Sequence, residues 1–178
     1  DVGYVSINHI GEQLCGDHVE LVEQDGGDSL VLVLADGLGS GVKASILSTL
    51  TAKIISTMMA NDLPLEDCVQ AIAKTLPICK VRGVAYSTFT ILRVTASLEA
   101  EIIQYDNPRV ILLRDGKGTP YPITERIIDG KAVAQSRVRL REGDTFVAVS
   151  DGVIHAGVGP KLNFGWQLLN ATAFLEEN

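Results

Sequence analysis

Residues 30–34 are apolar at every position, without the alternation that marks a strand with one solvent-facing side. Such a run predicts a β-strand that is covered on both faces. The segment before it, residues 18–22, alternates polar and apolar side chains, as a half-buried strand does. Residues 24–28 are rich in Asp and Gly and predict the turn between the two. The pattern therefore predicts a hairpin whose second strand lies inside the protein.

From residue 42 the apolar positions recur at three- and four-residue spacing, which predicts an amphipathic helix that ends near residue 61. Its expected buried face consists of Ala44, Leu47, Leu50, Ile54, Thr57 and Met58. Pro64 favours the start of a second helix over residues 65–76. The apolar face expected for this helix consists of Val69, Ile72, Ala73 and Leu76. Two consecutive helices thus separate two groups of strands.

Strand patterns return after the helices and continue nearly to the end of the chain. The expected strands are 86–95, 98–105, 109–114, 119–123, 138–140 and 145–150, in addition to residues 4–7 near the start, and residues 166–175 are expected to form a last helix. Turns at 115–118 and 141–144 predict hairpins. So many antiparallel strands in 178 residues imply two packed sheets. The expected fold class is α+β, in one domain over residues 1–178.

The composition is that of an ordinary folded protein, with 46% hydrophobic and 21% charged residues. A net charge of -7 argues against binding to nucleic acid or to an anionic membrane surface. No apolar run approaches the roughly 20 residues that cross a bilayer. The three cysteines form no CxxC motif, so neither a disulfide framework nor a zinc site is expected. Together these features predict a cytoplasmic protein.

Two segments share a local design, in which a buried apolar strand is followed by a small residue, Asp and Gly. They end in Asp36-Gly37 and Asp151-Gly152. A carboxylate at the end of a rigid strand is held in place, and a following glycine leaves its carbonyl accessible to a cation. Asp-Gly commonly makes turns, and this is the interpretation preferred for residues 115–116 and 129–130. Asp36 and Asp151 differ because they end the most apolar runs, which favours metal binding.

Asp17 is a third carboxylate of the same kind, because it lies at the entry to the strand before residues 30–34. If the two strands pair around the glycines of the turn, Asp17 lies close to Asp36. Three carboxylates at one end of a sheet repel one another unless cations neutralise them. Oxygen ligands alone favour Mg²⁺ or Mn²⁺ over zinc.

An ordered series of motifs accompanies these aspartates along nearly the whole chain. The motifs lie at residues 16–17, 35–41, 87–90, 106–108 and 149–153. In order and spacing the series resembles that of PPM-type (type 2C) serine/threonine phosphatases. The branch that it resembles contains stage II sporulation protein E and the Rsb-type stress-response phosphatases.

The resemblance implies a β-sandwich of two antiparallel sheets flanked by helices, in four αββα layers, with two metal ions at one edge. Residue by residue, Asp36 resembles the carboxylate that bridges both metals, and Gly37 resembles the residue that offers its carbonyl. Asp17 resembles the ligand of the second metal and Asp151 that of the first.

The same resemblance implies that Asp17, Asp36 and Asp151 form a catalytic centre with two Mn²⁺ or Mg²⁺ ions. Such a centre activates a water molecule for attack on phosphoserine or phosphothreonine, without a covalent enzyme intermediate. The implied partner is a phosphorylated regulatory protein, such as an anti-sigma-factor antagonist in sporulation or stress signalling.

The chain departs from the pattern at two places. Leu38 occupies the position where eukaryotic relatives carry a histidine, so the general acid is not identified, and neither His18 nor His155 is favoured for that role. The family ends with an Asp-Asp or Asp-Asn pair that leads into a last core strand, whereas here the sequence ends in Glu176-Glu177-Asn178. The sequence is therefore expected to lack the final strand, and the Asp151 metal to lack a ligand.

Two alternatives to an active phosphatase stay open. One is a pseudophosphatase that binds a signalling partner, and the other is a metal-free sandwich that acts as a sensor or scaffold. The glycine-rich segment 37–43 does not have the spacing of a dinucleotide or P-loop motif, and its glycines instead predict a tight strand-to-helix turn. A homodimer through the exposed helices is open by analogy.

Overall fold

The computed structural model describes residues 1–8, 10–61, 63–75, 87–128, 131–159 and 162–177. The strands are β1 (Asp17–Gln24), β2 (Ser29–Gly37), β3 (Ser87–Thr95), β4 (Glu99–Tyr105), β5 (Ile111–Arg114), β6 (Lys117–Gly118), β7 (Thr124–Ile128), β8 (Lys131–Arg139) and β9 (Thr145–Val147). The helices are α1 (Gly41–Ala60), α2 (Leu65–Thr75), α3 (Asp151–Ile154) and α4 (Leu168–Glu177), and a 3₁₀ turn, Asp25–Gly27, joins β1 to β2.

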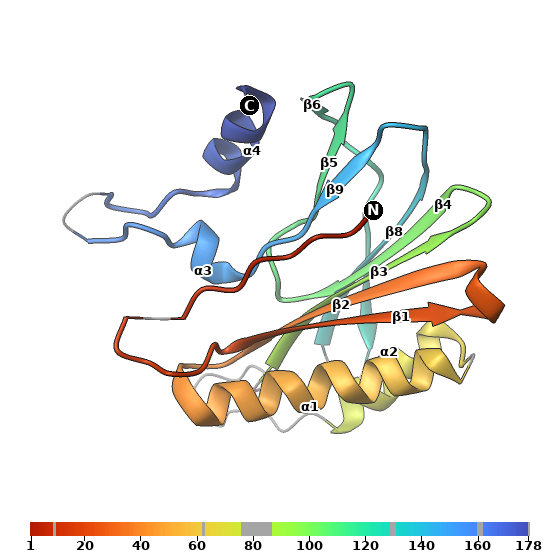
Figure 1. Ribbon diagram of the computed structural model, residues 1–178, viewed down its shortest axis with the longest axis horizontal. Helices are drawn as coiled ribbons and strands as arrows, with labels where there is room; N and C mark the ends of the chain where they lie inside the picture. The colour runs from red at the N-terminus through yellow and green to blue at the C-terminus, as the bar shows by residue number, and fades with distance from the viewer. Residues whose placement is uncertain (9, 62, 76–86, 129–130, 160–161, 178) are drawn as a thin grey trace.

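The strands form two sheets that lie one above the other (Figure 1). The large sheet has the order β1-β2-β3-β4-β8-β7 and the small sheet the order β6-β5-β9, and all pairings are antiparallel. Between them lies an apolar cluster built around Leu92, Ala100, Ile102 and Val110, against which Phe146 of β9 packs. The expected α+β class and the antiparallel sandwich with flanking helices are confirmed.

The other face of the large sheet is covered by α1 and α2, which lie side by side beneath it in Figure 1. The second apolar cluster lies here, and it includes Val33 and Phe89 from the sheet, Ile55 and Met59 from α1, and Ile72 from α2. β2 therefore packs on both faces, as its unbroken apolar run predicts. The predicted Val69 and Ile72 of α2 are buried, whereas Leu76 lies outside the described residues.

The buried face of α1 differs from the predicted one. Ala44 is buried as expected, but Leu50 is half exposed, and the buried residues are Gly41, Ala44, Ser48, Thr51, Ala52, Ile55, Ser56 and Met59. Most of these side chains are small, so the helix can lie close against the sheet. Apolarity alone therefore predicted the face only in part: Ile54 and Met58 pack against the core, whereas Leu50 is exposed, because this helix carries large apolar side chains on both faces.

Several strand boundaries also differ. Residues 4–7 form no strand, and residues 119–123 lie outside the sheets, although Tyr121 donates a hydrogen bond to the Val110 carbonyl over 2.5 Å. The predicted strand 138–140 is the end of the much longer β8. The turn at 141–144 is not a hairpin, because β8 belongs to the large sheet and β9 to the small one. The Asp115-Gly116 turn does form a hairpin, between β5 and β6, with positive φ at both residues.

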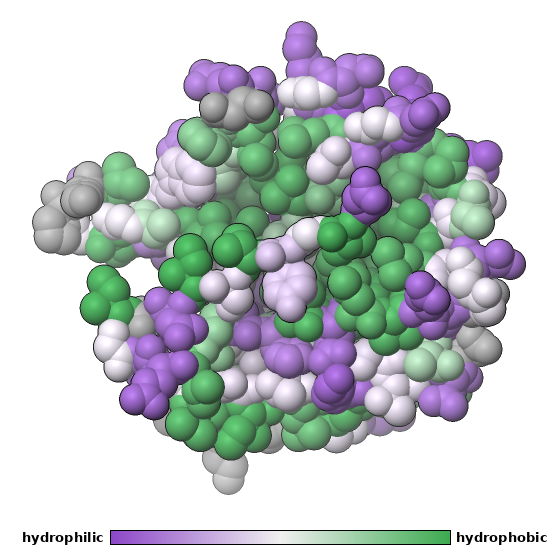
Figure 2. Space-filling view, in the orientation of Figure 1, coloured by the Kyte–Doolittle hydropathy of each residue, from purple (hydrophilic) through white to green (hydrophobic). Residues whose placement is uncertain are grey.

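The small sheet has much less cover than the large one. α4 contacts β6, where the Glu176 carboxylate accepts a hydrogen bond from the Gly118 amide over 2.7 Å, but Ala171 is the only buried residue of that helix. Phe164 and Leu169 are 76% and 80% exposed. Apolar side chains are correspondingly widespread on the molecular surface in Figure 2. Among the described residues, no helix is long and apolar enough to span a membrane.

Candidate metal centre

Asp17 and Asp36 face each other across the β1–β2 pair, at the edge where β1 begins and β2 ends. Directly opposed residues of an antiparallel pair point to the same side, with Cβ atoms about 5 Å apart. Val33 and Ala35, which alternate with Asp36 along β2, point the other way and pack in the cluster between the large sheet and α1. The two carboxylates therefore lie on the face toward the small sheet. The hairpin predicted from the sequence therefore brings the two carboxylates together as expected.

Asp151 reaches the same edge from the other sheet. It is the first residue of α3, which follows β9 (left in Figure 1). The residue before it, Ser150, donates a hydrogen bond from its hydroxyl group to Asp17 Oδ2 over 2.7 Å. This contact joins residues 133 positions apart and ties the start of β1 to the start of α3. All three predicted carboxylates thus gather where the two sheets meet.

The carboxylates perturb one another strongly. Burial, followed by the charges of Asp17 and Asp151 and hydrogen bonds with both, raises the pKa of Asp36 from 3.8 to about 8. An anion in this position is unfavourable because it loses water and meets two like charges. The side chains do not form a closed ligand cage: in the described part of the chain, no group of three His, Cys, Asp or Glu has the geometry to hold a metal ion.

Gly37 is required by packing. A Cβ atom at this position would lie 2.1 Å from the Ala44 carbonyl oxygen on α1. The Gly37 amide also donates to the Gly16 carbonyl over 3.1 Å, which continues the β1–β2 pairing past Asp17. Glycine therefore lets α1 pass directly beside the end of β2, a reason that differs from the predicted access to its carbonyl. Its role as a carbonyl ligand stays a prediction.

The turn from β2 into α1 has the tight geometry that its glycines predict. Gly39 and Gly41 have φ angles of 98° and 70°, which residues with a side chain rarely adopt. Glu12, which the sequence did not single out, lies over this turn and accepts a hydrogen bond from the Ser40 hydroxyl over 3.0 Å. A carboxylate beside the first turn of a helix is favoured by the helix dipole. Glu12 thus helps to fix the start of α1.

The two histidines near the motifs do not face the carboxylates in a catalytic arrangement. His18 Nε2 lies 2.6 Å from Glu20 Oε1, and its Nδ1 lies 3.4 Å from the Thr49 hydroxyl on α1. Since residues alternate along β1, His18 projects from the face opposite to that of Asp17. His155 ends α3 and is exposed, and its backbone amide donates to the Asp151 carbonyl. Neither was favoured as a general acid from the sequence.

Three polar residues of the edge were part of the sequence motifs but had no assigned role. Ser150 orients Asp17, Thr88 is paired with Asp36 across β2 and β3, and Asn107 contacts Thr88 over 2.6 Å. The motifs could have indicated the proximity of Ser150, which stands next to Asp151, and of Thr88, which is paired with Asp36. Their hydrogen-bond partners depend on tertiary structure and could not be deduced.

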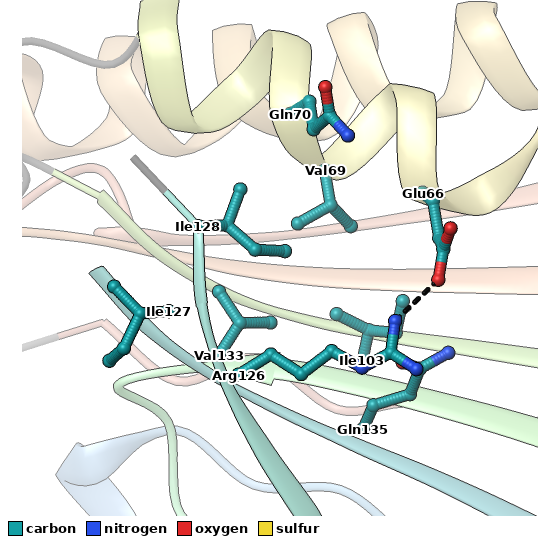
Figure 3. Close-up of a pocket in the computed structure, with 9 residues that line it drawn as sticks. All are labelled: Glu66, Val69, Gln70, Ile103, Arg126, Ile127, Ile128, Val133 and Gln135. Atoms are coloured by element: carbon teal, nitrogen blue, oxygen red, sulfur yellow. Dashed lines mark hydrogen bonds and ion pairs between the residues drawn. The ribbon is translucent and has the colours of Figure 1, made fainter. Parts of the chain in front are cut away.

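The hollows of the surface do not coincide with the carboxylates. The concavity in Figure 3, of about 130 Å³, lies between α2 and strands β7 and β8 on the helix-covered face, and the Glu66–Arg126 ion pair of 2.6 Å lies on one side of it. A polar hollow of about 260 Å³ lies beside Asn107 on the sandwich side. At the carboxylate edge, Asp151 is exposed, whereas Asp17 and Asp36 are partly buried.

Three solved structures with related folds place this site in context. The phosphatase domain with part of the regulatory domain of SpoIIE from Bacillus subtilis has a TM-score of 0.70 at 19% identity, and covers 85% of this chain and 45% of that one. The RsbU and RsbW domains of a Mycobacterium tuberculosis protein have a TM-score of 0.68 at 20% identity, with 86% and 44% coverage. RsbX in complex with magnesium has a TM-score of 0.64 at 20% identity, with 97% and 84% coverage.

These likenesses establish the fold as that of the PP2C-type phosphatases. The chain spans less than half the length of the first two structures. No curated protein sequence matches it significantly. The profile of the stage II sporulation protein E (SpoIIE) family matches residues 26–177, and the chain belongs to that family. The resemblance found in the motifs is thereby confirmed.

The family implies divalent metal ions, and the residues present fit them. Asp17, Asp36 and Asp151 offer only oxygen ligands, the set that Mg²⁺ and Mn²⁺ prefer. Burial and the neighbouring charges of Asp17 and Asp151 raise the pKa of Asp36 to about 8. A divalent cation supplies a positive charge and would favour the ionised form.

Proposed function

We propose that this domain hydrolyses phosphoserine or phosphothreonine on a protein substrate, with two Mn²⁺ or Mg²⁺ ions held by Asp17, Asp36 and Asp151. The observation that carries the proposal is the convergence of the three carboxylates, from β1, β2 and the start of α3, on one edge. SpoIIE-family membership supports the reaction class.

Bound divalent ions would lower the pKa of a water molecule and offset the charge on the phosphoryl group. The chain's own residues have simpler tasks. Asp36 makes hydrogen bonds with both Asp17 and Asp151 and is therefore assigned to both ions, with Asp17 and Asp151 each assigned to one. Ser150 holds Asp17 by its hydrogen bond of 2.7 Å, and the packing of α1 against Gly37 holds the end of β2.

The proposed substrate is a phosphorylated regulatory protein, such as an anti-sigma-factor antagonist. Support comes from related structures whose descriptions name an RsbW domain beside RsbU and a bacterial stressosome. The exposed Asp151 is accessible to a phosphorylated side chain on a folded surface. A cytoplasmic location and a homodimer belong to the same proposal and rest on the sequence and on analogy.

A pseudophosphatase is the second candidate, favoured by Leu38 and by the lack of a preformed ligand cage among the described residues. Hydrolysis of p-nitrophenyl phosphate with and without Mn²⁺ separates the two. We expect Mn²⁺-dependent turnover by the wild type and a loss of about 1,000-fold in Asp36→Asn, because a bridging ligand supports several kcal/mol of transition-state stabilisation.

Asp115→Asn is the matched control, because Asp115 also precedes a glycine but lies in the β5–β6 turn. It belongs to none of the motifs that contain the three carboxylates. Its activity should equal that of the wild type. Mn²⁺ binding without turnover would favour the pseudophosphatase, and no Mn²⁺ binding would overturn the metal centre.

A further inference from the structure

A buried polar network continues from the carboxylate edge into the space between the sheets. Thr88 on β3 is paired with Asp36 on β2, so their side chains project to the same face. Thr90, two residues further along β3, lies on that face as well and is fully buried. Asn107, in the turn after β4, is 9% exposed and touches both threonines.

The hydrogen bonds of this network have a defined direction. The Thr88 hydroxyl donates to Asn107 Oδ1 over 2.6 Å, and Asn107 Nδ2 donates to the Thr90 hydroxyl oxygen over 3.2 Å. Gln104 anchors the far end, because its Nε2 donates to the Pro108 carbonyl and its Oε1 accepts from the Val110 amide. Backbone groups cannot exchange donor and acceptor roles, so they fix the orientation of the Gln104 amide.

Gln104 Nε2 also donates to the Thr90 oxygen over 3.2 Å. The Thr90 oxygen therefore accepts from two amide groups, and the Asn107 carbonyl is left to accept from Thr88. The hydroxyl group of Thr88 has one proton, and this contact occupies it. On the side of Asp36, the Thr88 hydroxyl can then only accept a hydrogen bond, through its oxygen lone pairs.

The backbone is shaped to hold Asn107 in this place. Asp106, the residue before it, has a φ angle of 51°, in the left-handed region that Asp and Asn adopt more readily than other residues with side chains. Pro108 follows and restricts the next φ angle. The Asp-Asn-Pro segment thus turns the chain after β4 so that the amide of Asn107 faces back toward β3.

We propose that Asn107 is a positioning residue for the metal centre. By accepting the hydrogen bond of the Thr88 hydroxyl, it presents the Thr88 oxygen as a fixed hydrogen-bond acceptor beside Asp36, where it would accept a hydrogen bond from water bound at the centre. The proposal rests on the proposed metal centre and adds a residue that does not itself touch metal or substrate. A network that served only the sandwich core would make the same bonds but would not affect metal binding.

The test is a double-mutant cycle on Mn²⁺ affinity, measured by electron paramagnetic resonance of free Mn²⁺. Thr88→Val and Asn107→Leu keep the side-chain volume nearly constant and remove the contact from either side. Each should weaken Mn²⁺ binding by about 10-fold, within the range that outer ligand partners show in metal sites. The double variant should be no weaker than the single ones, because both changes remove the same interaction.

Two further variants separate positioning from folding. Thr88→Ser keeps the hydroxyl group and should bind Mn²⁺ nearly as the wild type does. Thr95→Val removes a hydroxyl from the far end of the same strand, where it bonds Ser97 and Glu99, and should leave Mn²⁺ affinity unchanged. Circular dichroism melts verify that each variant is folded. If Asn107→Leu does not fold, the Mn²⁺ affinity of Thr88→Val is the test of the proposal.

Wild-type affinity in both folded Thr88→Val and Asn107→Leu, or additive losses in the double variant, would overturn the proposal. Mn²⁺ binding by the wild type without phosphate release would overturn the proposed hydrolase activity alone, since the cycle measures affinity. Absence of Mn²⁺ binding by the wild type would overturn both.

Discussion

Asp36-Gly37 and Asp151-Gly152 share a dipeptide and a site, but the protein holds them by different means. Asp36-Gly37 ends β2, a strand paired on both sides, and α1 lies so close that Gly37 has no room for a Cβ atom. Asp151-Gly152 begins α3, a helix of four residues, none of them buried. The nearest atom to a Cβ at Gly152 would be Ser150 Oγ, at 3.8 Å.

The difference shows how a metal centre can be built across two sheets. In the large sheet, Asp17 and Asp36 are held by strand pairing and by the packing of α1 against the end of β2. The small sheet delivers Asp151 on a short exposed helix, and the Ser150–Asp17 hydrogen bond joins the two halves. We therefore expect a substitution at Gly37, where α1 packs, to lower the stability of the whole fold. A substitution at Ser150, next to Asp151, should mainly weaken metal binding.

Gly37→Ala should have the largest effect. Its Cβ would lie 2.1 Å from the Ala44 carbonyl oxygen and 2.8 Å from Ala44 Cα, so α1 must move away from the sheet. We expect a loss of about 3 kcal/mol in the free energy of unfolding, the upper end for overpacking, because the obstructing atoms are backbone. Urea denaturation measures the change.

Gly152→Ala is the matched control for that prediction. Apart from its chain neighbours and the helix backbone, no atom lies closer than 3.8 Å to the added methyl group, and alanine favours helix over glycine. The free energy of unfolding should change by no more than about 0.5 kcal/mol. Equal losses in the two variants would remove the distinction between the packed and the open dipeptide.

Ser150→Ala should have a smaller and more local effect. It removes the hydrogen bond between the two halves of the site and releases Asp17 Oδ2. We expect Mn²⁺ affinity to fall by about 10-fold, with a loss of about 1–2 kcal/mol in unfolding free energy. Isothermal titration calorimetry and urea denaturation provide the two values.

Ser48→Ala is the control, since the Ser48 hydroxyl is also buried but donates to the Ser45 carbonyl within α1. Its Mn²⁺ affinity should equal that of the wild type. An unchanged affinity in Ser150→Ala would show that Asp151 and Asp17 are placed without the contact.

Much of the fold could be predicted because the relevant signals are local. The unbroken apolar run of β2 and the glycine-rich turn into α1 each depend on neighbours in sequence, and both predictions are confirmed. The buried face of α1 was predicted only in part, because most of its buried residues are small or polar and their burial depends on contact with the sheet. The 141–144 turn was misread because nothing local indicates that the chain changes sheets there.

The residues of the site show the same difference between local signals and tertiary contacts. Asp17, Asp36 and Asp151 could be predicted because each lies at the end of a recognisable strand and matches a motif. Ser150, Asn107 and Glu12 act through partners between 17 and 133 residues away, and such partners cannot be read from the sequence around them. The predicted metal ligation itself stays a prediction.

The central claim is that Asp17, Asp36 and Asp151 are crowded together because they bind a divalent cation, which would favour the ionised form of Asp36. The folded protein raises the pKa of Asp36 from 3.8 to about 8, so folding without metal takes up a proton between these values. Stability due to this group is therefore greatest below about pH 4 and is lost as the pH rises toward 8. The Asp36→Asn variant does not lose stability in this pH range, because its side-chain amide stays neutral.

The deciding measurement is the melting temperature of wild type and Asp36→Asn at pH 8, with EDTA and with Mn²⁺. We predict that in EDTA the Asn variant melts higher than the wild type, and that Mn²⁺ raises the melting temperature of the wild type alone. An Asn variant that melts lower in EDTA, and that Mn²⁺ stabilises as much as it does the wild type, would contradict the account.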